Sequence, residues 1–145
     1  MTAAPAVTTA ASKLLSGPSP RLFTVAFTPA KARVAYMRRI TTTHLRYWRV
    51  PVDASEDIVV SVSELVTNAL RYAPDDVVLT VRYADDELRI EVFDGNPAPA
   101  RPREAAEDDE SGRGLFLVAL LAGDWGVSDD GKTTWAHFRI HAGRS

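Results

Sequence analysis

One stretch of the chain repeats hydrophobic and polar positions with the period of an α-helix. Between residues 53 and 74, hydrophobic side chains recur every three or four positions, and polar side chains fall on the opposite face. The hydrophobic set is Ile58, Val62, Leu65, Val66, Ala69 and Ala73, and the polar set is Asp57, Ser61, Glu64, Asn68 and Arg71. Asp53 and Glu56 have the spacing of a capping box, and Pro74 does not continue a helix. This stretch therefore predicts an amphipathic helix capped by Asp53 and ended by Pro74.

Shorter hydrophobic segments predict the remaining elements. β-Branched and aromatic residues predict strands, with short polar turns joining two pairs into hairpins, over residues 21–27, 77–83, 88–93, 125–128 and 133–141. Helical spacing is fair from Pro29 to about Trp48, where the threonines at 41–43 weaken it, and residues 112–121 are apolar and helical. This order of elements predicts a two-layer α/β sandwich with helices on one face of a mixed sheet.

Two segments fall outside these elements. Residues 1–20 are rich in Ala, Thr, Ser and Pro without a basic start or a compact hydrophobic block, so we expect a flexible tail and no secretory signal. Residues 94–112, DGNPAPARPREAAEDDESG, are charged and proline-rich. A loop of this length inside a compact domain is usually functional or disordered. We therefore expect a single domain over 21–145 that contains one long loop.

Composition then excludes several classes of protein. The 145 residues are 46% hydrophobic and 25% charged, with a formal net charge of -2 and a pI of about 5.9. Because a dedicated nucleic-acid binder is usually basic, we expect no direct nucleic-acid partner. The absence of cysteine removes disulfides and thiolate metal sites and fits a reducing compartment. No hydrophobic run approaches the roughly 20 residues that cross a bilayer, so we expect a cytoplasmic protein with no membrane partner.

The predicted helix carries a pair of residues suited to phosphate chemistry. Glu64 and Asn68 are four residues apart and share one side of the helix. An asparagine carbonyl oxygen suits Mg²⁺, which completes its coordination with waters and phosphates. A glutamate one turn earlier is placed to polarise or deprotonate a hydroxyl aimed at a terminal phosphate. Spacing alone favours the alternative, a solvated polar helix face.

Two further positions place polar groups at the ends of predicted elements. Asp94 follows a strand, where a carboxylate can accept a hydrogen bond from an exocyclic amine such as that of adenine; a turn-initiating aspartate before Gly95 is the alternative. Gly112, Arg113 and Gly114 precede the apolar helix. A helix start exposes free N–H groups that suit a phosphate, and an arginine adds a charged contact. The alternative is a loop that leads into a core helix.

Two other features point away from a P-loop and from a metal centre. Residues 126–133, GVSDDGKT, match the P-loop pattern, but a P-loop must open a helix. The residues that follow are β-branched and aromatic, so we interpret this stretch as strand, turn and strand. His44, His137 and His141 show no metal-ligand spacing with one another, and we expect structural or surface roles for them.

Taken in order, four stretches resemble the GHKL nucleotide-binding domain. They are SELVTNALRYA (within residues 61–73), VFDGNPAP (92–99), SGRGLFLVALLAGDWGV (111–127) and GKTTWAHF (131–138). The first resembles the N box, the next two resemble the two glycine boxes, and the last resembles the closing threonine-bearing strand. The resemblance implies a Bergerat-type fold, a bound ATP with Mg²⁺, and a lid over residues 95–112.

The resemblance also implies a role for each matching residue. Asn68 would hold the Mg²⁺, and Glu64 would stand at the general base of the small serine kinases in this group. Asp94 would bind the adenine amine, with Thr133 near it and Thr134 as the second choice. The other residues implied to contact the nucleotide are Gly95, Gly112, Arg113, Gly114 and Leu115.

Two positions depart from the family pattern. The first glycine box usually has glycine two residues after the aspartate, where this chain has Asn96 and places its glycine one position earlier, at Gly95. Tyr72 stands where similar chains often have histidine. The first departure concerns the adenine side of the implied pocket.

The leading functional hypothesis is an anti-sigma-factor-like serine/threonine kinase. The resemblance implies that it transfers the γ-phosphate of ATP to an anti-anti-sigma partner, binds a sigma factor and so controls transcription. Similar proteins are often homodimers. The alternative is a non-catalytic ATP-binding module that captures partners, which the altered glycine box favours and the intact Glu64 and Asn68 disfavour. A histidine-kinase catalytic domain is a third reading, but the chain shows no helix pair with a phospho-accepting histidine.

Overall fold

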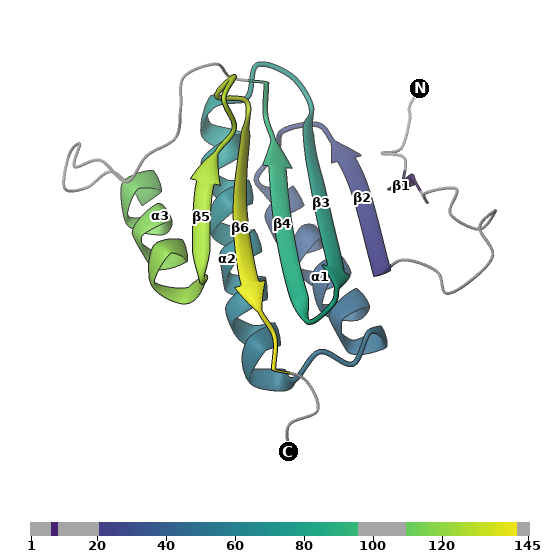
Figure 1. The fold of residues 1–145 in the computed structure, drawn as a ribbon. Coiled ribbons are helices and arrows are strands. Elements are labelled where there is room, and N and C mark those ends of the chain that lie inside the picture. Colours follow the sequence, from purple (N-terminus) through teal and green to yellow (C-terminus); the bar gives the residue numbers. More distant parts are fainter. Residues whose placement is uncertain (1–6, 9–20, 96–109, 142–145) are drawn as a thin grey trace.

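The computed structural model describes residues 7–8, 21–95 and 110–141, with side chains placed over 21–95 and 115–141. Its elements, in order, are β1 (Val7–Thr8), β2 (Arg21–Phe27), α1 (Ala32–Tyr47), α2 (Val52–Tyr72), β3 (Val77–Ala84), β4 (Glu87–Phe93), α3 (Glu110–Leu121), β5 (Asp124–Val127) and β6 (Thr133–Arg139). The three helices lie together on one face of a single sheet (Figure 1). The predicted two-layer α/β sandwich is therefore confirmed.

The sheet is antiparallel at every described pairing, whereas we predicted a mixed sheet. Its strand order is β1-β2-β3-β4-β6-β5. Two successive helices separate β2 from β3, so the chain returns to the sheet in the opposite direction (Figure 1). One helix separates β4 from β5, which makes these two strands parallel, but β6 lies between them in the sheet. Each strand thus has only antiparallel neighbours.

Alternating burial along the strands builds the core. In β3, β4 and β6 every second side chain is buried on the helix side, as expected when one face of a sheet is covered. The fully buried side chains of the core include Val25, Phe27, Met37, Leu45, Ile58, Val62, Leu65, Leu79, Ile90, Leu115 and Val118. All three helices and the four long strands contribute to the buried set, so the described residues share one core.

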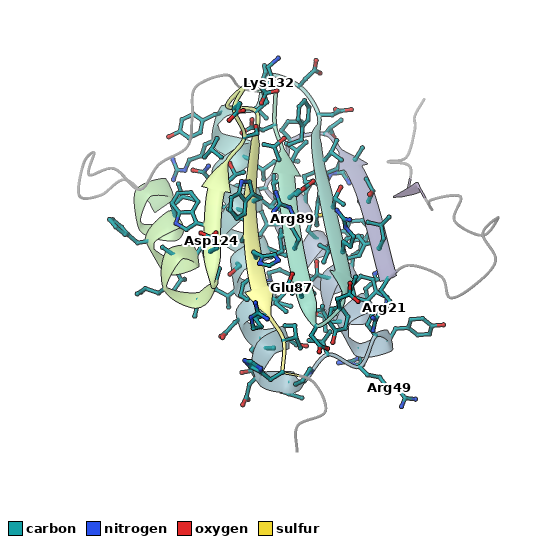
Figure 2. The ribbon with its side chains drawn as sticks, in the orientation of Figure 1. Arg21, Arg49, Glu87, Arg89, Asp124 and Lys132 are labelled. Carbon is teal, nitrogen blue, oxygen red and sulfur yellow. The ribbon has the colours of Figure 1, made fainter. Side chains whose placement is uncertain are left out.

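Polar and charged side chains pair on the open face of the sheet, along β4 and between β4 and β6. Arg89 Nε donates to Glu91 Oε2 over 2.7 Å, and its guanidinium lies 4.6 Å from the Trp135 ring centroid. Glu87 lies 3.3 Å from both His137 Nε2 and Arg139 Nη2, and Figure 2 shows Glu87 and Arg89 on this face. Paired charges of this kind keep an uncovered sheet face compatible with water. His137 therefore has the surface role that we expected.

The threonine run that weakened the first predicted helix does not interrupt α1. Thr41 is fully buried, and its Oγ1 donates to the carbonyl of Met37 one turn earlier over 2.7 Å. A threonine that bonds back in this way can remain inside a helix without an unsatisfied hydroxyl. His44 Nδ1 lies 3.0 Å from the Ile40 carbonyl oxygen, and its ring stacks on Phe23 at 4.3 Å. His44 is thus structural, as expected.

The start of α2 differs from the predicted capping box. Pro51 occupies the cap position without a side-chain hydrogen bond, and Asp53 lies inside the first turn. Proline suits a helix start because it has no N–H to leave unbonded and its φ is already restricted. Asp53 still stabilises the helix, since a negative charge near the amino end opposes the helix dipole. The Ser55 hydroxyl donates a hydrogen bond to the Val50 carbonyl over 3.3 Å, which ties the first turn of α2 to the residue before Pro51.

The amino-terminal segment contributes a two-residue strand. β1 pairs with β2 through Val7 opposite Val25 and Thr8 opposite Thr24. It lies within the segment that we predicted as a flexible tail, of which residues 1–6 and 9–20 lie outside the described residues. Among the described helices, none combines the length and hydrophobicity of a membrane span.

Candidate functional site

Two residues on the polar side of α2 are buried. Ser61 is 0% exposed and Asn68 is 6% exposed, while Glu64 between them is half-buried. Ser61 and Asn68 are seven residues apart, nearly two full turns, and therefore lie on the same side of the helix. The solvated polar face that spacing alone favoured is thus wrong for these two positions.

The packing of neighbouring helices explains this burial. α1 and α3 both contact α2 and lie on either side of it (Figure 1). Val52, Ser55 and Val59 line a groove toward α1. Helical geometry places Ser61 and Asn68 on the other flank, toward α3. Glu64 lies next to this flank, between Ser61 and Asn68 along the helix.

Asp94 and Gly95 follow β4 at one end of the sheet. The Asp94 N–H donates to the Lys132 carbonyl over 3.0 Å, which ties the residue to the turn before β6. Figure 2 shows Lys132 at this end of the molecule. Val92 is buried on the helix side and Phe93 is exposed on the open side, so alternation directs Asp94 to the helix side. Gly95 has a φ of +73°, a backbone conformation that glycine adopts without strain.

Thr133 and Thr134 lie on opposite faces of the sheet. In β6 Thr134 is buried with Ala136 on the helix side, while Thr133 is half-buried on the open side. Thr134 pairs with Val92 across the strands, which makes it a diagonal neighbour of Asp94 on the same face. Thr133, our first choice from the sequence, does not share that face, because consecutive strand residues point in opposite directions.

The start of α3 is earlier than the sequence predicted. The helix begins at Glu110, so Gly112, Arg113 and Gly114 lie within its first two turns instead of before it. Their side chains, and residues 96–109 of the predicted lid, lie outside the described residues. The first four N–H groups of a helix have no partner within it, so the free donors belong to residues 110–113. Leu115 is 1% exposed and belongs to the hydrophobic core, where its side chain packs.

The stretch that matches the P-loop pattern is a hairpin, as predicted. β5 and β6 pair antiparallel, with residues 128–132 forming the turn between them. Asp130 Oδ1 accepts hydrogen bonds from Ser128 Oγ at 2.6 Å and from the Lys132 N–H at 2.9 Å. These bonds hold the pKa of the Asp130 carboxyl below its ordinary value of 3.8. The carboxylate of Asp130 thus stabilises the turn. Gly131 and Lys132 belong to this turn and not to a P-loop.

These positions meet at one end of the sandwich. The carboxyl-terminal half of α2, the amino end of α3, the end of β4 and the start of β6 all lie at the same end of the sheet (Figure 1). The fold therefore gathers Asn68, Asp94, Thr134 and the first turn of α3 from four separate parts of the chain. The sequence analysis did not predict the burial of Ser61. The alternation of residue types along β6 could have indicated that Thr134, and not Thr133, faces the helices.

A family model for the histidine kinase-like ATPase domain matches residues 27–138. The chain belongs to this family. The match covers every element of the site described above, from α2 to β6. The GHKL resemblance drawn from four short motifs is therefore confirmed.

Individual relatives agree with the family. Three curated proteins, each called serine-protein kinase RsbW and each from a strain of Listeria monocytogenes, are 34% identical to the chain over 89 residues. The matches cover 50% of this chain and 57% of the relative, so the chain spans little more than half the length of these proteins. A crystal structure of the RsbU and RsbW domains of a Mycobacterium tuberculosis protein has a TM-score of 0.61 and 19% identity, covering 81% of this chain and 32% of that one. That likeness establishes the fold.

The residues of this histidine kinase-like ATPase domain fit a magnesium nucleotide better than a metal held by protein alone. Within the described residues, no three His, Asp or Glu side chains gather as a metal cage. Mg²⁺ commonly takes one or two protein ligands and fills its shell with phosphates and water. The buried side chain of Asn68, on the flank of α2 toward α3, could supply one such protein ligand.

Proposed function

We propose that the chain is an ATP-dependent serine/threonine protein kinase that phosphorylates an anti-anti-sigma protein and binds a sigma factor. The observation that carries the proposal is the burial of Asn68 on the α3-facing flank of α2, one turn from Glu64. The carbonyl oxygen of an asparagine is a ligand that Mg²⁺ accepts, so Asn68 on this flank would suit a magnesium nucleotide. The RsbW relatives, which are serine-protein kinases by name, support the reaction, and the partners are those that the resemblance to anti-sigma-factor kinases implies.

Each residue has a role in this proposal. Asn68 would coordinate Mg²⁺, and the free N–H groups at the start of α3 would hold phosphate oxygens. Asp94 would accept the adenine amine, with Thr134 beside it on the same face. Glu64 would take the proton from the attacking hydroxyl of the substrate. Since phosphoryl transfer depends chiefly on positioning and charge neutralisation, these few groups suffice for the chemistry.

The cellular setting is part of the same proposal. A kinase that controls a sigma factor acts on transcription, and it works in the cytoplasm where RNA polymerase is. A homodimer follows from the resemblance to anti-sigma kinases. Sedimentation of the purified chain would measure that state directly.

A non-catalytic function is the second candidate. The first glycine box has Gly95 one position earlier than the family pattern, with Asn96 in the usual glycine position. A shifted glycine alters the backbone beside the adenine side of the site and favours weaker nucleotide binding. In this alternative the domain captures its partner without transferring phosphate.

Replacing Glu64 by Gln distinguishes the two candidates. The side chain keeps its size and loses its basicity, so we expect phosphate transfer from γ-labelled ATP to a panel of anti-anti-sigma proteins to fall at least about 100-fold. Calorimetry should give the same ATP affinity for the variant and the wild type. Asn68→Ala is the matched comparison, because it should abolish the Mg²⁺-dependent part of ATP binding. Transfer by E64Q at the wild-type rate would reject Glu64 as the base. No ATP binding by the wild type at millimolar concentration would favour partner capture.

A further inference from the structure

Charge is divided unevenly along the chain. Residues 1–52 contain no Asp or Glu, although the whole chain has 19. The same residues contain eight cations, namely Lys13, Arg21, Lys31, Arg33, Arg38, Arg39, Arg46 and Arg49. All of α1 lies in this part, so its arginines have no carboxylate one turn away on the same helix. A helix with only basic charges favours an acidic partner.

The arginines of α1 form a ridge along the side that faces α2. Arg38, Thr42 and Arg46 are spaced four residues apart and therefore follow one line on the helix. Arg38 and Arg46 are exposed, and Arg39 beside them is exposed as well. Within the described part of the chain, none of these three arginines forms an ion pair. Their charges are thus available to another molecule.

A groove of about 610 Å³ runs beside this ridge, between α1 and α2. Its lining is mostly apolar and consists of Val50, Val52, Val59 and Val60 together with Thr42, Arg46, Ser55 and Glu56. Val52 is 71% exposed and Val60 is 38% exposed, so two of the apolar side chains face solvent along the groove. An exposed apolar strip bordered by charge is typical of a protein-binding surface.

The groove is separate from the nucleotide site. Its residues on α2 lie in the amino-terminal half of the helix and on the flank toward α1. Asn68 lies in the carboxyl-terminal half and on the flank toward α3. A molecule in the groove would therefore leave Asn68 and Asp94 open to ATP.

We propose that this groove binds an acidic amphipathic helix of a partner protein. The apolar ridge of such a helix would lie on Val59 and Val60, and its carboxylates would face Arg38 and Arg46. A groove between two helices matches the helix-in-groove mode of recognition. Asp53, Glu56 and Asp57 on the α2 side of the groove would repel an evenly anionic ligand such as a nucleic acid or a membrane, so the partner helix would carry its carboxylates on the flank toward α1.

A titration followed by NMR tests the proposal on the whole chain. The probe is a stapled helical peptide of about 20 residues with leucines on one ridge, glutamates on one flank of that ridge and glutamines elsewhere, a length at which a helix can be kept stable. Amide shifts of ¹⁵N-labelled protein should be confined to residues 38–60, and saturating ATP should not change the affinity. A charge-reversed peptide with lysines in place of glutamates should bind at least about 10-fold more weakly.

Variants then distinguish binding in the groove from nonspecific attraction between the charges of the peptide and the protein. The double variant Arg38→Glu, Arg46→Glu and the single variant Val60→Asp should each weaken binding at least about 10-fold, with unchanged circular dichroism and melting. Arg82→Glu changes an exposed arginine on the open face of the sheet and should have no effect. Equal binding of both peptides, shifts centred elsewhere, or no binding at millimolar peptide would overturn the proposal. Concentration-dependent dimerisation that Arg46→Glu abolishes would also overturn it, because the occupant would then be a second copy of this chain.

Discussion

At the scale of single residues, the main finding at the candidate site is the burial of two polar side chains on α2. Ser61 and Asn68 are both withdrawn from water on the same flank of α2, and both belong to the set that sequence spacing assigned to the outer face. A serine can be buried for packing at modest cost, whereas an asparagine brings four hydrogen-bonding valences with it. Burying Asn68 therefore requires more hydrogen-bond partners than burying Ser61 does.

Ser61→Ala tests whether the buried serine hydroxyl lowers the stability of the fold. Its Oγ is fully buried and has no hydrogen-bond partner among the described residues. Removing a buried unsatisfied hydroxyl should raise the free energy of unfolding by about 1–3 kcal/mol. Thermal denaturation should show a melting temperature several degrees higher, at about 2–4 °C per kcal/mol. A lower melting temperature would indicate that a bound water or ligand satisfies the hydroxyl.

Thr134→Val and Thr133→Val form a matched pair at the adenine side of the site. Both replacements keep β-branched residues suited to a strand, but only Thr134 lies on the face that carries Asp94. Loss of one hydrogen bond, about 0.5–1.5 kcal/mol, should weaken ATP binding about 2- to 10-fold in T134V and leave T133V unchanged. Calorimetry measures both. The reverse order of affinities would return the role to Thr133.

At the scale of elements, local pattern gave the identity of each helix and strand but not always its ends. α2 and α3 were found from hydrophobic spacing, yet α2 begins after Pro51 and α3 begins at Glu110. Helix ends depend on which groups satisfy the free N–H donors, and several neighbouring residues can do so. The hairpins were more sharply predicted, because polar turn residues between β-branched strands leave few other arrangements.

Gly126→Ala tests how closely β5 and β6 pack. A Cβ at Gly126 would stand 2.7 Å from Cζ2 of the Trp135 ring, so the ring must move from its place beside the Arg89 guanidinium. We expect a loss of about 1–3 kcal/mol in the free energy of unfolding, measured by urea denaturation. Gly123→Ala is the control, because its Cβ would meet the His137 carbonyl at an ordinary 3.5 Å. Equal stability of both variants would show that Trp135 has room to shift.

At the scale of the whole molecule, the order of strands in the sheet brings the site together. β6 inserts between β4 and β5, which places Thr134 beside β4 and next to the end that carries Asp94. α3 lies against α2 on the flank away from α1. The two proposed sites therefore use different flanks of α2, the nucleotide site the flank toward α3 and the helix-binding groove the flank toward α1.

Deleting residues 1–20 tests how far the fold depends on its first segment. β1 adds only two residue pairs at the edge of β2, and the described core begins at Phe23. We expect the truncated chain to keep its circular dichroism spectrum and to lose no more than about 2–4 °C in melting temperature. Unfolding or aggregation of the truncated chain would show that the segment protects the exposed edge of β2.

The sequence by itself determined the secondary structure, the sandwich and the family, because these follow from local periodicity and from short motifs of fixed spacing. It also indicated Glu64, Asn68 and Asp94 as candidates. The antiparallel pairing, the burial of Ser61 and Asn68, and the burial of Thr134 on the helix side of the sheet were decided only by tertiary structure. Local spacing fixes which side chains share a face of an element, whereas the packing of distant elements fixes which face is withdrawn from water.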